Sequence, residues 1–530
     1  MKKERYWSKR AESDGPWDAV VIGSGMGGMT TAAMLAKMGH RVLVLEQHYV
    51  PGGFTHAFRR KGYTWDVGVH AVGEVTEHSM PGRLLHYLTD GRLKWASLGE
   101  VYDQFDFPDG IRIGFPDRPE KFRQNLIEVF PEEGEAIDKY IALVRETAGA
   151  MRGYYLSRAL PKWMMPAARM FMSRKAEGFL SRRTADEIAK LTDNPRLRTV
   201  FAAQWGYYGV APSRASWVMQ ALVVRHFFYG GYYPVGGSER IAVELLRTVA
   251  EAGGWTRVVA DVEQILVEKG RAVGVRMADG EEIRAKMIVS AAGIRATVGR
   301  LLPESFRDAA WVSDVEKLTP AAAHVSLYIG FKGDIREAGA GSENRWFYNT
   351  WDTEVVHWDI SNPDDLPESP ILYCSFPSLK DPHHEPGPEQ RHTGEVVTFV
   401  PWDAFTQWSG TKWRKRGEGY EVLKEKLQAH LLQQFIDKMP HLEPLIDHVE
   451  LSTPLSTEHF VRPVRGSIYG LEPTPERFAT DALRPKSPIS GLYFSGSEVS
   501  AVGVIGAMMG GVLAATAAEP RKAMKIIRAN

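Results

Sequence analysis

The 530-residue sequence predicts an α/β fold in which two domains are interleaved along the chain. A strand, a glycine-rich turn, a helix and a second strand follow one another within residues 18–46, as in a βαβ unit. Strand-like alternation returns at 257–289, and an uncharged, glycine-dotted helical stretch occupies 499–518. The segments between these pieces carry helix and strand patterns of their own. We therefore expect one domain assembled from separated pieces and a second domain built from the segments between them.

The first domain is expected to be of the Rossmann type, and the second to be a mixed α+β domain. Residues 91–228 have a mostly helical pattern, whereas 301–480 combine strand-like runs with an amphipathic helix at 420–439. The proline-rich stretches 362–370 and 380–388 predict surface loops. The expected pieces are 15–90, 229–300 and 481–518 for the first domain, 91–228 and 301–480 for the second, and a basic, solvated tail at 519–530.

Composition excludes several classes of protein. Lys+Arg and Asp+Glu each number 65, so no net charge attracts nucleic acid. The single cysteine, Cys374, excludes an internal disulfide and a cysteine-rich metal site, and no metal is expected. Residues 1–17 lack the apolar core of a signal peptide, and no apolar run reaches 18 residues. We expect a cytoplasmic protein.

The turn after the first strand has the spacing that a dinucleotide needs. Its members are Gly23, Ser24, Gly25, Met26, Gly27 and Gly28. The first glycine permits the tight turn, the second lets the backbone approach a pyrophosphate, and the third lets helix and strand pack closely. Glu46 ends the next strand, where a carboxylate accepts hydrogen bonds from ribose hydroxyls. A glycine turn before an ordinary helix would explain the glycines but not this carboxylate.

Two further glycine-rich stretches extend the pattern. Gly52 and Gly53 follow Pro51, and they indicate either a second backbone approach to a ligand or a surface turn. The stretch 499–518 carries no charge, so its helix must be buried. The N-terminus of that helix can offer positive potential to a ligand, although a plain core helix has the same composition.

Taken in chain order, these motifs resemble the retinol saturases and, more broadly, the flavin-dependent phytoene desaturases and carotenoid isomerases. The resemblance covers nearly the whole chain, from about residue 18 to 518. It rests on 23–28, 43–47, 52–53, 66–70, 230–237, 289–293, 492–496 and the glycines at 503, 506 and 510.

The resemblance implies FAD as the cofactor and assigns its contacts. Its ADP half would lie on the first glycine turn and Glu46, its pyrophosphate or ribityl chain along Gly53 and Thr55, and its adenine beside the backbone of Val262. The flavin end would meet Glu498 and the helix start at 503–505. Two departures from the family concern the pyrophosphate contacts: Phe54 replaces an arginine, and Ser497-Glu498 replace an aspartate. The remaining expected contacts are Gln47, His70, Gly496, Gly503, Val504 and Ile505.

A dense group of aromatic residues is the candidate substrate pocket. We expect Tyr207, Phe228, Tyr232 and Tyr233 to line a site for a long apolar molecule, with ordinary core packing as the alternative. His70 and Tyr233 are the polar groups expected nearest the flavin, where either could deliver a proton. A lone histidine is more often structural than catalytic.

The expected activity is FAD-dependent reduction of a carbon–carbon double bond in a long polyene or isoprenoid lipid. The alternatives are desaturation of a carotenoid or acyl lipid, and cis–trans isomerisation. Two other classes share the cofactor fold. An amine or amino-acid oxidase would need a polar anchor for a charged substrate, which the sequence does not display, and a flavin-binding lipid carrier would show no turnover.

The expected partners are the apolar substrate, an electron donor or acceptor that the sequence does not specify, and a membrane surface. Residues 151–180 place arginine and lysine among bulky apolar side chains, as interfacial helices do. A pair of ordinary helices with solvated charges has the same composition.

Overall fold

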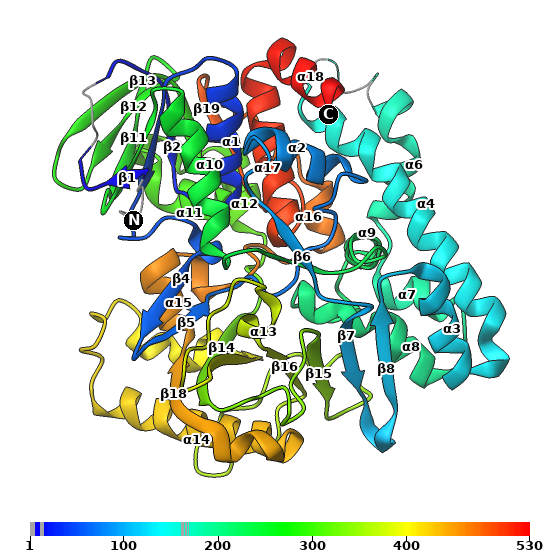
Figure 1. The fold of residues 1–530 in the computed structure, drawn as a ribbon. Coiled ribbons are helices and arrows are strands. Elements are labelled where there is room, and N and C mark those ends of the chain that lie inside the picture. Colours follow the sequence, from blue (N-terminus) through cyan, green and yellow to red (C-terminus); the bar gives the residue numbers. More distant parts are fainter. Residues whose placement is uncertain (1–5, 11–14, 161–163, 165–166, 168) are drawn as a thin grey trace.

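The computed structural model describes residues 6–10, 15–160, 164, 167 and 169–530 (Figure 1). Two sheets form its framework, with a group of helices beside them. In the first sheet the order is β1-β10-β3-β2-β13-β12-β11, with β19 also paired to β13. Its strands are β1 (Trp7–Ser8), β2 (Trp17–Ile22), β3 (Val42–Glu46), β10 (Trp255–Val258), β11 (Val262–Glu268), β12 (Arg271–Met277), β13 (Glu282–Ser290) and β19 (Leu492–Phe494).

The first sheet is parallel from β1 to β19, which confirms the predicted α/β class. Its central strands are apolar on both sides because both faces of the sheet are covered, one by helices and the other in large part by β11 and β12. Four of these strands, β19, β13, β2 and β3, end side by side: Ser290 pairs with Ile22 and with Phe494, and Ile22 pairs with Leu45. Ligands of open α/β sheets bind beyond the carboxyl ends of such strands.

Helices α1 (Met26–Lys37) and α17 (Gly503–Ala518) cross at very short range over this sheet (Figure 1). A Cβ added to Gly27 would lie 2.5 Å from the Cα of Gly496, and one added to Gly511 would lie 2.5 Å from the carbonyl oxygen of Gly27. The uncharged α17 is buried, as the sequence predicts. It begins at Gly503 rather than at 499 because the chain after β19 first makes a turn.

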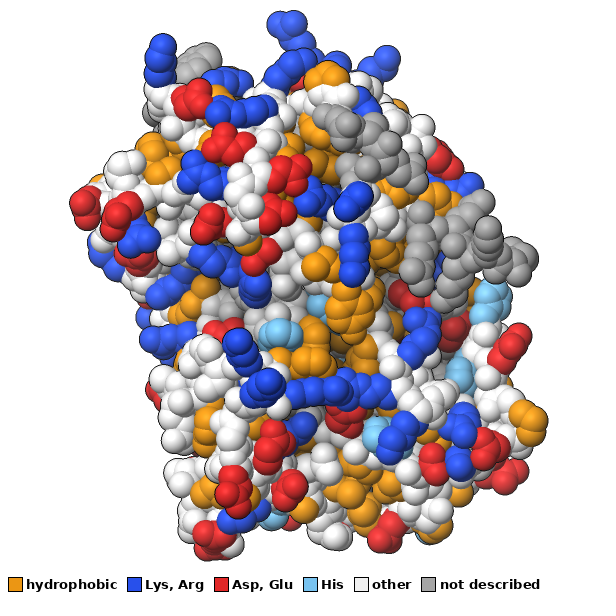
Figure 2. Space-filling model, turned by 90° about the vertical axis from the view of Figure 1, so that its left-hand side faces the viewer, with side chains coloured by type: hydrophobic (Ala, Val, Ile, Leu, Met, Phe, Trp, Pro, Cys, Tyr) orange, Lys and Arg blue, Asp and Glu red, His pale blue; other side chains and the backbone are white. Residues whose placement is uncertain are grey.

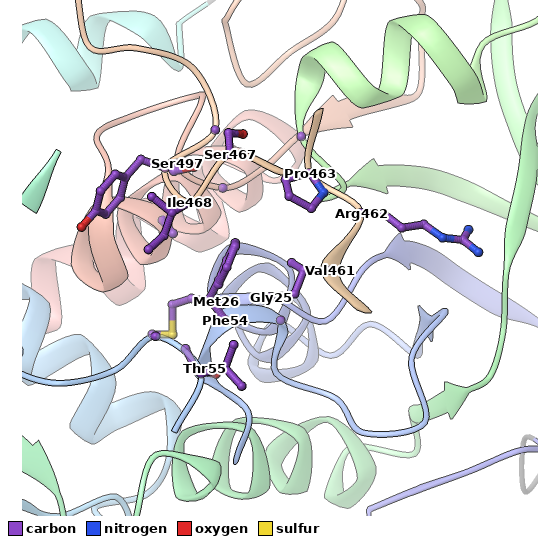
Figure 3. A pocket seen from close by; sticks show the side chains of 18 of the residues that line it. Gly25, Met26, Phe54, Thr55, Val461, Arg462, Pro463, Ser467, Ile468 and Ser497 are labelled. Carbon is purple, nitrogen blue, oxygen red and sulfur yellow. The ribbon is translucent and has the colours of Figure 1, made fainter. Parts of the chain in front are cut away.

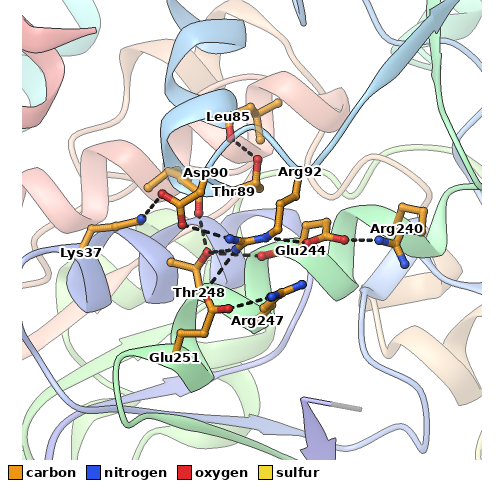
Figure 4. A network of polar contacts seen from close by, with 11 residues as sticks. Lys37, Leu85, Thr89, Asp90, Arg92, Arg240, Glu244, Arg247, Thr248 and Glu251 are labelled. Atoms are coloured by element: carbon orange, nitrogen blue, oxygen red, sulfur yellow. Dashed lines mark hydrogen bonds and ion pairs between the residues drawn. The ribbon is translucent and has the colours of Figure 1, made fainter. Parts of the chain in front are cut away.

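A polar network fastens α10 (Glu239–Glu251) to the chain that follows α2 (Met80–Leu88), as Figure 4 shows. The Arg92 guanidinium donates to the buried Glu244 carboxylate at 2.9 Å and to the Thr248 hydroxyl at 3.1 Å. The Thr248 hydroxyl in turn donates to the carbonyl of Leu88 at 2.7 Å. Lys37 pairs with Asp90 at 2.5 Å, which links the end of α1 to the same network.

The second sheet has the order β18-β14-β17-β16-β15-β7-β8 and lies below the first in Figure 1. The buried face of α14 (Glu418–Lys438) belongs to the same apolar core as its central strands. Its strands are β7 (Val101–Asp106), β8 (Arg112–Pro116), β14 (Ala323–Lys332), β15 (Asn344–Tyr348), β16 (Ile371–Ser375), β17 (Arg391–Val400) and β18 (Ile446–Ser452).

The helical group occupies the right of Figure 1. Its members are α3 (Pro119–Val129), α4 (Gly134–Arg158), α6 (Arg174–Leu180), α7 (Thr184–Ala189), α8 (Pro195–Ala202) and α9 (Trp217–His226). The helical pattern predicted for 91–228 is wrong at its start, where β6 (Trp95–Ser97), β7 and β8 form. These strands are short, so their local sequence gives little sign of strand structure. They are stabilised by pairing with strands far along the chain, β7 with β15 and β6 with β9.

The hairpin of β4 (Ala57–Arg60) and β5 (Tyr63–Asp66) connects the first glycine turn to the second sheet. The Trp65 indole N–H donates to the carbonyl of Ile329 at 3.0 Å, and the Tyr63 hydroxyl donates to Asp447 at 2.9 Å. This attachment places the end of β5 beside the face of the second sheet.

The tail predicted to be solvated is instead a helix, α18 (Pro520–Ala529). Ala523 and Ile526 are buried against the first domain, and the Lys522 ammonium donates to the carbonyl of Met38 at 3.1 Å. In the part of the chain that the structure describes, no helix is both long and apolar enough to cross a membrane.

Candidate active site

A large cavity begins at the carboxyl ends of β2, β3 and β13 and extends to the second sheet. Figure 3 shows Gly25, Met26, Phe54 and Thr55 facing Val461, Pro463 and Ile468 across it. Sixteen of the residues expected at a cofactor or substrate line this cavity: Gly23, Gly25, Met26, Gly27, Glu46, Gln47, Gly53, Phe54, Thr55, His70, Tyr207, Val262, Gly496, Glu498, Gly503 and Val504.

The glycines of the first turn divide into two physical roles. Gly25 has ordinary extended backbone angles, and a Cβ added there would meet no protein atom within 4 Å. This position therefore opens onto the cavity. A Cβ on Gly28 would overlap the carbonyl of Gly23, and Gly27 abuts Gly496, so these two glycines permit close packing of the backbone. Gly28 lies outside the cavity lining.

Glu46 sits at the end of β3, where its carboxylate is already partly engaged. It accepts from the backbone N–H and hydroxyl of Ser24 at 2.9 and 2.6 Å, and from the backbone N–H of His48 at 2.8 Å. Since a carboxylate has about four acceptor positions, about one is left for a hydroxyl of a ligand. Ser24 is turned toward Glu46 and lies outside the cavity lining.

The N-terminus of α17 reaches the other side of the cavity. Gly503 and Val504 line it, and no side chain caps the first turn. Its free N–H groups and helix dipole favour a ligand that carries negative charge. Ile505 belongs to this turn, but its side chain packs into the core beneath. The Glu498 carboxylate accepts from the backbone N–H groups of Ile294 and Arg295 at 2.5 and 3.1 Å, so its own contacts are structural.

The far end of the cavity is lined by one face of the second sheet. Its apolar and aromatic members are Trp346, Ile371, Tyr373, Val397 and Phe399, with Ile468 and Tyr469 on the chain that follows α15 (Pro454–Val461). None of these residues was predicted from the sequence as part of the site. A sequence signal for them exists, because side chains alternate between the two faces of a strand. In β16 and β17 every second residue therefore faces the cavity.

Three of the aromatic residues expected at the substrate lie outside the cavity lining. Phe228 is buried in the core of the helical group. Tyr232 lies on β9 (Tyr232–Pro234) opposite Ser97, and its hydroxyl donates to the carbonyl of Tyr229 at 3.2 Å. The buried Tyr233 donates to the Asp66 carboxylate at 2.5 Å. Only Tyr207 of the group reaches the cavity, where its hydroxyl donates to Asp103 at 2.8 Å.

His70 lines the cavity where the two sheets meet, beside the ring of Tyr373. Burial, together with the smaller effects of the charges of Lys380 and His324, lowers the pKa of the imidazole to about 3. The ring is therefore neutral at pH 7 and carries one N–H.

A second cavity adjoins the first, and His56, Val67, His324, Phe460 and Val461 line both. Figure 2 shows the face where it opens: apolar and histidine side chains lie in a hollow, and lysine and arginine side chains run along its rim. The basic residues of its lining are Arg59, Arg60, Arg414, Arg416 and Lys424. Among the described residues, no group of three or more His, Cys, Asp or Glu side chains is placed to hold a metal ion.

Comparison with known proteins agrees with this geometry. Residues 26–518 match the family described as flavin containing amine oxidoreductase. A solved structure of putrescine oxidase with bound putrescine superposes with a TM-score of 0.60 over 95% of this chain and 99% of that one. At 16% identity this likeness shows the fold alone.

Three relatives are similar over nearly the whole chain. An all-trans-retinol 13,14-reductase of Danio rerio is 32% identical over 96% of this chain and 86% of its own length. A second Danio rerio protein, named as an inactive all-trans-retinol 13,14-reductase, is 30% identical over 95% and 86%. The chloroplastic prolycopene isomerase of Arabidopsis thaliana is 27% identical over 94% and 83%.

These matches confirm the resemblance that the motifs indicate, and they confirm a flavin as the cofactor. The chain belongs to the flavin containing amine oxidoreductase family and, within it, groups with the all-trans-retinol 13,14-reductases as a flavin-dependent oxidoreductase.

Proposed function

We propose that the protein uses FAD to reduce a carbon–carbon double bond in a long apolar polyene of the retinoid type. The observation that carries this proposal is the composition of the cavity. Its one end has the glycines, carboxylate and helix N-terminus suited to a dinucleotide, and its other end is aromatic. One continuous space would thus hold the cofactor against an apolar chain.

The residues at the first end fit FAD. Gly25 leaves room for a pyrophosphate, and Glu46 retains about one acceptor position for a ribose hydroxyl. Arg300 and Arg462 also line the cavity, so positive charge is available although Phe54 replaces the arginine of relatives. The first turn of α17 would face the flavin end. When bound, FAD would accept or supply a hydride at this boundary between the two ends.

The aromatic end suits a polyene better than an amine. Among the described residues the carboxylates that line the cavity are Glu46, Asp261 and Glu498, and none of them belongs to the face formed by Trp346, Tyr373, Val397 and Phe399. An ammonium substrate needs a charged or polar anchor. A long chain instead gains about 0.8 kcal/mol for each CH₂ group that it buries. The relatives named as retinol reductases favour reduction of such a chain.

Isomerisation is the second candidate, because a prolycopene isomerase is among the relatives. An isomerase would return the flavin to its starting state without net oxidation. A third candidate is a protein that binds flavin and lipid without turnover, because one relative is named as inactive.

Mixing experiments under anaerobic conditions test the proposed function. The dithionite-reduced protein should be reoxidised by a retinoid or a related polyene, and shortened analogues should react more slowly because they bury less surface. Product analysis separates a reduced polyene from an isomerised one. Bleaching of the oxidised flavin by amines, with no response to polyenes in either flavin state, would overturn the proposal.

Replacing Gly25 tests the cofactor site separately from the fold. Gly25→Val places side-chain carbons in the open space of the turn, so we expect normal folding and at least a tenfold loss of flavin affinity, or about 1.4 kcal/mol. Flavin absorbance and the melting temperature of the apoprotein measure the two effects.

Gly27→Val and Gly149→Val are the matched controls for Gly25→Val. Gly27→Val should lower the melting temperature itself, because its side chain meets the backbone of Gly496. Gly149→Val lies on the exposed side of α4 with open space around it and should change neither quantity. Full flavin occupancy in Gly25→Val would contradict the assigned turn.

We also propose that the protein contacts a membrane surface from the cytoplasmic side. The exposed apolar side chains that we call the patch are Leu156 on α4 and Met170, Phe171 and Met172 on the segment 169–173 that packs against α4; Phe171 is 77% exposed. The exposed Arg152, Arg174 and Lys175 lie in the same part of the sequence, and such a combination is typical of interfacial segments. Residues 161–163, 165–166 and 168 of the predicted segment 151–180 lie outside the described residues.

Vesicle sedimentation tests the membrane contact. The protein should sediment partly with anionic vesicles at low salt and be released at high salt, because part of the attraction is screened charge. Phe171→Ser should weaken the binding, whereas Val355→Ser, which removes an exposed apolar side chain elsewhere, should not. Equal sedimentation of Phe171→Ser and the unaltered protein would argue against the patch.

A further inference from the structure

A row of buried polar side chains crosses the second sheet next to the aromatic end of the cavity. Glu395 pairs with Ser375 and with Tyr328, and Asn344 pairs with Asp103. Two positions further along the same strands, Val397 and Tyr373 line the cavity. Because strand residues i and i+2 share a face, the polar row and the cavity lining lie on the same face of the sheet.

The buried charges around this row do not balance. Three carboxyl groups, those of Asp66, Asp103 and Glu395, surround one amino group, that of Lys380. Lys380 is the last residue of α13 (Pro377–Lys380). Its ammonium group donates to the carbonyl of His70 at 2.8 Å and to the Ser375 hydroxyl at 2.7 Å. At least one of the three carboxyls must therefore hold a proton for the group to approach neutrality.

The hydrogen bonds identify Glu395 as the group that keeps its proton. Asp66 accepts from the hydroxyls of Tyr233 and Ser238, which favours its carboxylate form. Asp103 accepts from Tyr207 and Asn344 at 2.8 Å each. Among the described residues, the one donor to Glu395 is the backbone N–H of Asp66, at 3.0 Å. Burial, and after it the nearby charge of Asp66, raise the pKa of Glu395 well above its usual range.

Glu395 also has a direct route to the cavity. Its Oε2 atom lies 3.3 Å from Nδ1 of His70, close to but outside hydrogen-bond geometry, and a small rotation of the ring would align the two groups. The imidazole side chain is 14% exposed in the cavity lining, and among the described residues no partner hydrogen-bonds its Nε2 atom. The remaining titratable neighbours of the pair are Asp66, His324, Tyr233, Tyr328, Tyr373 and Lys380.

We propose that Glu395 and His70 form a proton relay that opens into the cavity and supplies the proton for reduction of the double bond. This inference rests on the proposed function. It assigns His70 as the group that meets the substrate and Glu395 as a positioning and proton-storing residue behind it. Tyr207 and Tyr233 are excluded from this role because each hydroxyl donates to a buried carboxylate.

The step balances in atoms and electrons. One carbon of the double bond gains a hydride, and both electrons of that new bond come from the reduced flavin. The π electron pair of the double bond then binds the Nε2 proton of His70, so that the neighbouring carbon gains a C–H bond. The N–H pair stays on the ring, and Nδ1 takes the proton of Glu395 as that O–H bond breaks. His70 ends neutral in its other tautomer, in keeping with the low basicity of a buried ring. The Glu395 carboxylate is stabilised by Lys380 until solvent returns a proton.

Glu395→Gln tests the relay because the amide can still accept from Asp66 but carries no acidic proton. We expect reoxidation of the reduced protein by a polyene to slow by roughly 10²-fold or more, the usual contribution of a general acid. Flavin occupancy, melting temperature and the spectral response of the oxidised protein to a polyene should stay as in the unaltered protein. Glu395→Asp should recover part of the rate.

Glu450→Gln is the matched control. Glu450 pairs with Tyr328 on the same row of the sheet, but its carboxylate faces Arg60. The same carboxyl-to-amide change there should leave the rate unaltered. An equal loss of rate in both variants would show a general effect of the sheet and would overturn the relay.

If Glu395→Gln loses its flavin, the relay is tested instead with His70→Gln and with the double variant that carries both substitutions. We expect His70→Gln to lose a similar factor and the double variant to lose no more than either single one, because the two residues act in one path. Infrared difference spectra give an independent readout: at pH 7 the unaltered protein should show a protonated buried carboxyl band that Glu395→Gln lacks.

The outcomes separate the relay from the proposed function. If the unaltered protein reacts with polyenes and Glu395→Gln reacts at the same rate, the relay is wrong and the function stands. If no polyene reoxidises the unaltered protein, the proposed function fails and the relay fails with it. Absence of the carboxyl band in the unaltered protein would contradict the stored proton without bearing on the function.

Discussion

The contact between the backbones of α1 and the turn before α17 is the constraint on which the cavity depends. A Cβ added to Gly27 would lie 2.5 Å from the Cα of Gly496, so the position of Gly27 tolerates no side chain. The same approach brings the N-termini of the two helices to the carboxyl edge of the parallel sheet. Unpaired N–H groups from residues more than 470 positions apart therefore face a single space, since α1 begins at Met26 and α17 at Gly503. A flavin site follows from this packing before any ligand contact is considered.

One face of the second sheet carries apolar side chains that line the cavity and, in the neighbouring row, buried polar side chains. The row through Tyr373 and Val397 presents aromatic and aliphatic surface, which would orient the proposed long substrate without hydrogen bonds. The next row carries Glu395 and Asp103. Asn344 and Tyr207 donate to Asp103, the backbone N–H of Asp66 donates to Glu395, and the positive charge of Lys380 lies near both carboxyls. An apolar cavity with acid chemistry directly behind it suits the protonation of carbon, for which water must stay away while a proton remains available. Under the proposed function, the amine oxidase fold would accommodate a different substrate through this face.

The sequence could predict those features that depend on local chemistry. The turn at Gly23 to Gly28, the strand that ends at Glu46 and the buried uncharged helix each have a signature confined to about 30 residues or fewer. The features that were missed depend on partners distant in the chain. Tyr233 was expected beside the flavin, but Asp66 holds its hydroxyl away from the cavity. Lys380 was expected in a surface loop, yet it is 3% exposed because His70 and Asn344 provide acceptors for its ammonium group.

The central claim is that one cavity binds a two-ended flavin dinucleotide against an aromatic face, and identification of the cofactor tests it most directly. Protein purified under native conditions should release FAD on denaturation, in about one equivalent per chain. FMN should not replace it, because FMN lacks the ADP half that Glu46 and the turn at Gly25 would hold. NAD should not replace it, because the chain belongs to a family of flavin-containing enzymes. Release of FMN or NAD, or failure of the folded protein to take up added FAD, would contradict the account.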